Sequence, residues 1–156
     1  MDKINETESK NIIYKIHEAK KISYFENDLS DLGLPNKKIN NSLVDYNVSF
    51  KIDDEKSLIQ IKFSAKFYLK KNKKKFDLFG IDTLHGFKIK NFNKSIKRDN
   101  NSYRIPDILM LTFLNLSVSG SRGMLAILNS KYEYCDILFP IVSTIDLLNK
   151  LKPPKK

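Results

Sequence analysis

A strict alternation of apolar and polar side chains between Ile59 and Leu69 constrains the fold more than any other feature. Every second residue is apolar, and most residues between them are lysine, serine or glutamine. Because successive side chains of a β-strand point to opposite faces, this pattern predicts a strand with one buried face and one face in water. A second apolar run, 76–84, follows, so residues 70–75 are expected at the tip of an antiparallel hairpin.

Two further strands are expected before this hairpin. The parity of the apolar residues in 12–24 favours a strand bent near Glu18–Lys20, and the weaker alternative is a helix over 12–21. Residues 26–41 are rich in Asn and Asp and predict a loop, and 46–52 predict a short strand.

The region after Ile105 is expected to be helical. Proline is suited to the first turn of a helix, so Pro106 marks the start. Leu109, Phe113 and Leu116 form one apolar stripe, and other apolar residues fill most of the remaining circumference. Such a helix must be covered on several sides by the sheet, a second helix, a partner chain or a ligand.

The end of the chain predicts one more, shorter helix. Gly120 and Gly123 either end the first helix or admit another backbone closely. After an apolar connector, 137–142, Ser143 with Asp146 resembles a capping box that begins the second helix. Strands first and helices after them indicate an α+β fold, with the helices on one face of an antiparallel sheet. The expected domain spans 12–151, between disordered tails at 1–11 and 152–156.

The net charge of +10 is concentrated in one part of the chain. Residues 62–98 contain 12 lysines and arginines and two aspartates, which accounts for the whole excess. A basic surface of this kind makes nucleic acid a candidate partner, because phosphates need only positive charge at a suitable spacing. The candidate contacts are Lys62, Lys66, Lys70, Lys71, Lys73, Lys74 and Lys75. A basic single-domain nucleic-acid-binding protein is therefore the alternative function. Lysines at strand edges also prevent pairing between molecules.

Catalysis is not expected from these residues. His17 and His85 are the only histidines, Asp82 and His85 fall on opposite faces of a strand, and Cys135 has no neighbouring base. We expect no metal site and no cofactor. The polar N-terminus lacks a secretory signal, and the apolar stretch 105–118 is too short to span a bilayer, so a cytoplasmic location without membrane partners is expected.

The order of these segments resembles the SecB-like chaperones, the cytoplasmic holdases of bacterial protein export. The segments that carry the resemblance are the opening strand 14–26, the hairpin strands 59–69 and 75–84, Ile-Pro-Asp-Ile-Leu at 105–109, Leu-Ser-Val-Ser at 116–119 leading to Ser-Arg-Gly at 121–123, and Leu-Phe-Pro-Ile-Val at 138–142. The resemblance implies a four-stranded antiparallel sheet with a long and a short C-terminal helix packed on one face. It also implies a homo-oligomer, a dimer or a dimer of dimers.

The same resemblance implies an ATP-independent chaperone that binds unfolded polypeptide or preprotein in an apolar groove between sheet, connector and last helix. The groove candidates are Phe25, Phe113, Leu116, Phe139, Ile141, Leu147 and Leu148. Export members of the family recruit the motor SecA through an acidic surface on the sheet. Lys62 and Lys66 occupy the exposed face here, which argues against SecA docking. Other members hold an antitoxin, and a dedicated client of that kind is the alternative to export.

Overall fold

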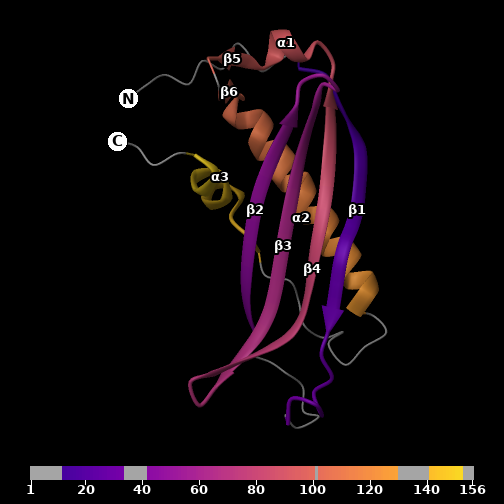
Figure 1. Ribbon diagram of the computed structural model, residues 1–156, viewed down its shortest axis with the longest axis vertical. Helices are drawn as coiled ribbons and strands as arrows, with labels where there is room; N and C mark the ends of the chain where they lie inside the picture. The colour runs from indigo at the N-terminus through magenta and orange to yellow at the C-terminus, as the bar shows by residue number, and fades with distance from the viewer. Residues whose placement is uncertain (1–11, 34–41, 101, 130–140, 153–156) are drawn as a thin grey trace.

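A four-stranded antiparallel sheet forms the body of the molecule, and two helices lie against one of its faces (Figure 1). The computed structural model describes residues 12–33, 42–100, 102–129 and 141–152. The strands are β1 (Tyr14–Glu26), β2 (Leu43–Asp53), β3 (Leu58–Lys71) and β4 (Lys74–Ile89), in the spatial order β1-β4-β3-β2. The predicted α+β class is confirmed.

The β3–β4 hairpin is the centre of the sheet. Its alternating pattern places Ile59, Ile61 and Phe63 in the core, with Lys62 and Lys66 on the opposite, solvent-facing side, as the sequence predicted. The turn is shorter than expected. Lys71 pairs with Lys74, so only Asn72 and Lys73 form the tip, at φ values of 51° and 64°. Positive φ at both central residues is the geometry of a two-residue hairpin turn that matches the twist of the strands.

β1 is a long edge strand rather than a helix. Its pairing with β4 is irregular between Ile16 and Glu18 and again between Lys21 and Ser23. After the first irregularity the alternation of side chains between the two faces of the sheet is reversed, and after the second it returns to the original pattern. Tyr14 and Tyr24 therefore both face the helices, as the parity of the sequence predicted, although the irregularities flank the segment where one bend was expected.

The polar segment after β4 has structure that the sequence analysis missed. It contains the short helix α1 (Phe92–Ser95) and a small hairpin of β5 (Lys97–Asp99) and β6 (Ser102–Arg104). The Tyr103 hydroxyl donates a hydrogen bond of 2.6 Å to Asp54 in the β2–β3 turn. The guanidinium of Arg98 lies 3.4 Å from the same carboxylate, so one aspartate holds this hairpin to the end of the sheet.

The long helix α2 (Asp107–Asn129) runs through Gly120 and Gly123, so neither glycine ends it. Gly120 instead admits a neighbouring side chain, because a Cβ at this position would lie 2.6 Å from Cε1 of His85. The short helix α3 (Thr144–Leu151) begins as predicted. The Ser143 hydroxyl caps it by accepting the backbone N–H of Asp146 at 3.2 Å.

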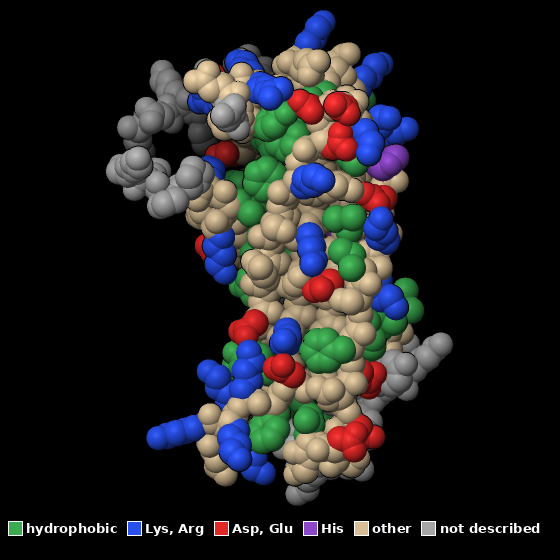
Figure 2. Space-filling view, in the orientation of Figure 1, with side chains coloured by type: hydrophobic (Ala, Val, Ile, Leu, Met, Phe, Trp, Pro, Cys, Tyr) green, Lys and Arg blue, Asp and Glu red, His purple; other side chains and the backbone are tan. Residues whose placement is uncertain are grey.

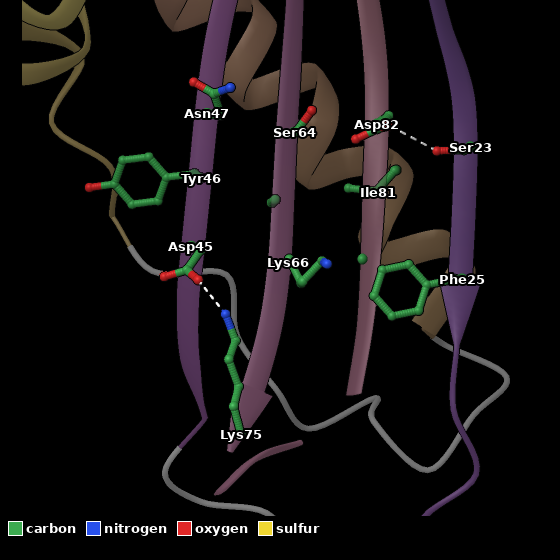
Figure 3. Close-up of a pocket in the computed structure, with 12 residues that line it drawn as sticks. Ser23, Phe25, Asp45, Tyr46, Asn47, Ser64, Lys66, Lys75, Ile81 and Asp82 are labelled. Atoms are coloured by element: carbon green, nitrogen blue, oxygen red, sulfur yellow. Dashed lines mark hydrogen bonds and ion pairs between the residues drawn. The ribbon is translucent and has the colours of Figure 1, made fainter. Parts of the chain in front are cut away.

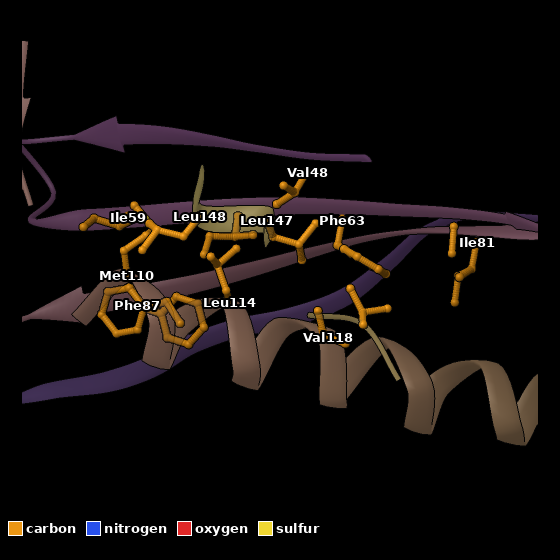
Figure 4. Close-up of a cluster of buried hydrophobic side chains, with 14 of the residues drawn as sticks. Val48, Ile59, Phe63, Ile81, Phe87, Met110, Leu114, Val118, Leu147 and Leu148 are labelled. Atoms are coloured by element: carbon orange, nitrogen blue, oxygen red, sulfur yellow. The ribbon is translucent and has the colours of Figure 1, made fainter. Parts of the chain in front are cut away.

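The core lies between the sheet and the two helices. Figure 4 shows Leu147 and Leu148 of α3 beside Leu114 of α2 and Val48 of β2. At the other side of the core, Phe87 of β4 stacks on a ring of α2. Both helices therefore cover the same face of the sheet. At the far end of α3, the Lys152 ammonium lies 2.6 Å from Asp107, which ties the end of α3 to the start of α2.

α2 is longer than the apolar stretch that the sequence analysis considered. By length and composition alone, α2 is long and apolar enough to cross a membrane. In its most apolar window, 44% of the residues are buried inside the molecule. A core helix can have the same length and apolar composition, because it buries apolar side chains against a sheet.

Candidate polypeptide-binding site

Three of the predicted groove residues lie in the core. Phe113 and Leu147 have no exposed surface, and Leu148 is 7% exposed. The ring of Phe113 stacks on Phe87 with centroids 4.1 Å apart and meets Tyr14 edge-on. In this structure these three side chains hold α2 and α3 to the sheet. Their position is that of core residues and differs from the open groove lining that was predicted.

Phe25 lies on the other side of the sheet from the helices. Its neighbour Tyr24 faces α2, where its hydroxyl donates a hydrogen bond of 3.1 Å to Asn129 Oδ1. The next side chain along a strand points the opposite way. The ring of Phe25 accordingly covers Gly80 on the outer face, where a Cβ on Gly80 would collide with it. The structure therefore does not bring Phe25 together with the groove candidates of the last third.

The outer face carries a shallow trough of about 550 Å³ (Figure 3). Ser64 and the backbone of Gly80 line it, and the ring of Phe25 lies at one side. Its charges are already paired within the chain. Lys75 contacts Asp45 at 2.7 Å on one side, and Ser23 donates a hydrogen bond of 3.0 Å to Asp82 on the other. This trough presents polar and apolar surface in comparable amounts.

Open apolar side chains gather instead beside α3. Ile141 is 92% exposed and Ile145 is 62% exposed, and both belong to the end of the connector and the first turn of α3. α3 lies beside the edge strand β2 (Figure 1), where the Lys150 ammonium lies 5.1 Å from the ring centroid of Tyr46. Phe50 of β2 adds a further exposed apolar side chain. We call Tyr46, Phe50, Ile141 and Ile145 the β2–α3 surface.

Of these four residues, only Ile141 was a candidate from sequence. Phe139, the other connector candidate, lies outside the described residues. The missed residues carried a signal, because Tyr46 and Phe50 share one parity of the second strand. Ile145 carried none, because the sequence does not show which positions of this short helix meet the sheet.

A second open surface runs along α2. Leu116 is partly exposed and belongs to a stripe without charged side chains. Members of this stripe are spaced three or four residues apart, so they share one side of the helix. The α2 stripe consists of Ile108, Thr112, Asn115, Leu116, Ser119, Gly123 and Ile127, and Arg122 lies at its margin. Ile108 and Ile127, at its two ends, are 58% and 71% exposed.

The lysines of the predicted nucleic-acid surface fall into two groups. Lys62 lies 3.9 Å from Asp82 and Lys66 lies 3.4 Å from Asp77, in addition to the pair of Lys75 with Asp45. Figure 2 shows blue and red side chains interspersed over the sheet and blue ones gathered over the hairpin tip. The charge of the sheet face is thus compensated locally. Of the seven predicted lysines, the four at the tip have no carboxylate within 4 Å among the described residues; these are Lys70, Lys71, Lys73 and Lys74.

A buried polar cluster connects β4 with α2. The Ser121 hydroxyl lies 2.7 Å from Oγ1 of Thr83 and 3.4 Å from Nε2 of His85, and it donates to the Ser117 carbonyl at 2.7 Å. Burial lowers the pKa of His85, which is 3% exposed. A serine beside a neutral histidine is an arrangement that enzymes use for nucleophiles. Here the serine has no exposed surface and its proton is engaged by a helix carbonyl, so a substrate has no access to it.

No grouping of three or more His, Cys, Asp or Glu side chains suited to a metal ion is present in ranges 12–33, 42–100, 102–129 and 141–152. His85 and Asp82 do lie on opposite faces of β4. Asp82 pairs with residues of the outer face, whereas His85 points to α2.

The fold has a clear counterpart among solved structures. The chain resembles the SecB-like chaperone Rv1957 of Mycobacterium tuberculosis, solved in complex with a ChAD peptide from the antitoxin HigA1, with a TM-score of 0.53 and 8% identity. The match covers 83% of this chain and 91% of that one. A Streptococcus agalactiae protein of unknown function matches with a TM-score of 0.37 and 10% identity. That match covers 84% of this chain and 98% of the other, and its TM-score is too low to establish a shared fold.

No protein-family model and no curated protein sequence matches the chain. The fold is therefore assigned from the structure and not from sequence similarity. A sheet in the order β1-β4-β3-β2 with a long and a short helix on one face is the SecB-like fold. The resemblance expected from the sequence is confirmed at the level of the fold.

Proposed function

We propose that this protein is an ATP-independent chaperone, a holdase, that binds unfolded polypeptide on the β2–α3 surface. The observation that carries the proposal is the exposure of Ile141 and Ile145 beside an edge strand, in a chain with the SecB-like fold. A soluble domain rarely leaves neighbouring large apolar side chains open unless something binds there. We propose no enzymatic activity and no cofactor for this function.

The energetics suit a binder of many sequences. Burial of one large apolar side chain contributes roughly 1.5–3 kcal/mol, so a few contacts hold an extended segment without a specific sequence. β2 pairs with β3 on one side, and within the described residues no strand lies along its other edge. An extended client can add backbone hydrogen bonds at such an edge.

We favour a dedicated client, such as an antitoxin, over general export of preproteins. The structural relative was solved with an antitoxin peptide, and the lysine–carboxylate pairs on the outer face of this chain offer no acidic surface for SecA. The protein would act in the cytoplasm, where such a client is made. Transfer to a partner or folding of the client would end the interaction.

The α2 stripe is assigned a different role, as the contact between copies of this chain. We propose a dimer or a dimer of dimers that uses Leu116 and Ile127. Its members are uncharged although Arg122 borders them, which suits the contact of a symmetric helix pair. Client binding and assembly would then use separate surfaces.

The experiment compares two matched variants of exposed residues, Ile145→Ser and Leu116→Ser. We expect the wild-type protein to suppress aggregation of a chemically unfolded client at near-stoichiometric amounts without nucleotide. Ile145→Ser should raise the amount required several-fold and leave the native mass unchanged, whereas Leu116→Ser should lower the native mass. Absence of protection and of unfolded-peptide binding by the wild-type protein would refute the proposal.

A further inference from the structure

The end of the β3–β4 hairpin projects beyond the rest of the sheet (Figure 1). β2 begins at Leu43, opposite Tyr68, and β1 ends at Glu26, opposite Phe79. Residues 69–76 therefore form a two-stranded arm that no described strand flanks. We call this segment the basic arm. Its three-residue strands are about 10 Å long at the usual rise per residue.

Four lysines of the basic arm form no ion pair among the described residues. Lys62, Lys66 and Lys75 each have an aspartate within 4 Å, whereas the other four lysines of the arm have no carboxylate at that distance among the described residues. The side chains of Lys70, Lys71, Lys73 and Lys74 are exposed. Positive charge of this density attracts a compact anionic group.

The base of the arm is fixed in place. The Lys75 ammonium lies 3.9 Å from the ring centroid of Tyr68 and 2.7 Å from a carboxylate oxygen of Asp45. That carboxylate raises the pKa of Lys75, so this lysine stays charged and bound. Lys70 approaches the same ring from 5.9 Å. The exposed lysines beyond it are therefore presented on an ordered platform rather than on a free loop.

The chemistry of the arm fits an acidic polypeptide better than a nucleic acid. Binding of single strands uses aromatic rings on which bases stack, and Tyr68 is 8% exposed beneath Lys75. The arm contains no arginine, and the neutral pairs on the sheet do not continue a cationic track for a phosphate backbone. Lys71 and Lys74 are cross-strand partners, so two ammonium groups of the arm lie side by side and suit the carboxylates of an adjacent extended peptide.

We propose that the basic arm binds acidic stretches of a client polypeptide, and so forms a second contact separate from the apolar β2–α3 surface. This inference rests on the proposed chaperone function and names one chemical feature of the client. The open edges of the arm allow an acidic segment to pair as an added strand, with its carboxylates beside the lysines. Clients with both an apolar and an acidic segment would be selected over clients with only one of them.

The test uses the full chain and three labelled probes of equal length: a peptide alternating aspartate and serine, the same peptide with asparagine for aspartate, and oligo-thymidine. The arm variant carries Lys71→Gln, Lys73→Gln and Lys74→Gln. The control variant carries Lys88→Gln, Lys90→Gln and Lys94→Gln, which removes the same charge from exposed lysines elsewhere. Fluorescence anisotropy gives each affinity at about 0.01 M and about 0.15 M salt.

We expect the acidic peptide to bind, the asparagine peptide not to bind, and the arm variant to lose about tenfold in affinity. The control variant should lose less than about twofold, and salt should weaken the wild-type affinity. Equal losses in both variants would overturn the proposal, because net charge would then explain binding. Tighter, arm-dependent binding of oligo-thymidine would overturn it in favour of nucleic acid.

The same proteins separate this inference from the proposed function. A neutral, apolar unfolded peptide reports on the β2–α3 surface alone, and the arm variant should bind it as the wild type does. Loss of that peptide in Ile145→Ser with retention of the acidic one supports two independent contacts. If the wild type binds the acidic peptide but no apolar one, the chaperone proposal fails and the arm is a site for acidic peptides only.

Discussion

The two faces of the sheet are built from the same strands and hold their polar groups in opposite ways. The face under α2 and α3 is mainly apolar, and its polar residues Thr83 and His85 are buried and lie within hydrogen-bond distance of Ser121 of α2. The outer face is covered with lysine–aspartate pairs that remain exposed to water. Alternation along each strand places these two environments one residue apart.

This difference separates stability from charge. Buried apolar contacts contribute a few kcal/mol each, whereas exposed ion pairs contribute at most about 1 kcal/mol. The outer face can therefore change from acidic to basic with little effect on the fold. A net charge of +10 is compatible with the SecB-like fold for this reason, and it bears on partners rather than on architecture.

The largest expected effect is on the helix side. Phe113→Ala removes a ring that stacks on Phe87 and has no exposed surface. The cavity should lower the free energy of unfolding by about 3–5 kcal/mol. Urea denaturation measures the change, and Ile22→Ala at an exposed position of β1 is the control. A smaller loss in Phe113→Ala than in Ile22→Ala would contradict this account of the core.

A smaller effect is expected from the polar cluster on the same face. Burial lowers the pKa of His85 below its ordinary value of 6.5, and its cross-strand neighbours Ala19 and Ile61 offer no carboxylate. The unfolded chain takes up a proton first as the pH falls. Stability is therefore fully present above 6.5 and is lost as the pH decreases toward the lowered pKa.

Thermal unfolding between about pH 7.5 and about pH 5.5 measures this loss. His85→Gln keeps a donor for Ser121 and should flatten the decline, whereas His17→Gln, at an exposed position, should leave it as in the wild type. Glu18 also has a lowered pKa, because Lys20 and Gln60 hydrogen-bond its carboxylate, but it titrates below 4.5. Equal pH dependence in His85→Gln and wild type would rule out the cluster as the cause.

Much of this architecture was predictable because it depends on local patterns. The alternation of Ile59–Leu69 predicted β3, and Ser143 with Asp146 predicted the start of α3. The β5–β6 hairpin was not predictable, since one aspartate distant in sequence, Asp54, holds it. Gly120 was ambiguous for a similar reason, because its function depends on the approach of His85 from another element.

The candidate site was less predictable than the fold. An apolar side chain that lines a groove and one that fills a core look the same in sequence, and Leu147 and Leu148 proved to be core residues. Whether Phe25 belongs to a groove beside the helices depends on the face of the sheet that it occupies, and the sequence does not show this face. The pairing of lysines on the outer face was also hidden, because each partner aspartate comes from another strand or another position in the hairpin.

The smallest expected effect tests the outer face directly. Lys62→Gln removes a pair with Asp82 in which the atoms lie 3.9 Å apart and both side chains are substantially exposed. Water screens such a pair, so urea denaturation should give a change within about 0.5 kcal/mol of the wild type. Lys75→Gln should cost slightly more, because Lys75 also packs on the Tyr68 ring. A loss in Lys62→Gln comparable to that of Phe113→Ala would mean that charge on the outer face does support the fold. In that case the basic surface would be a structural requirement, and its replacement could not be used to separate client binding from stability.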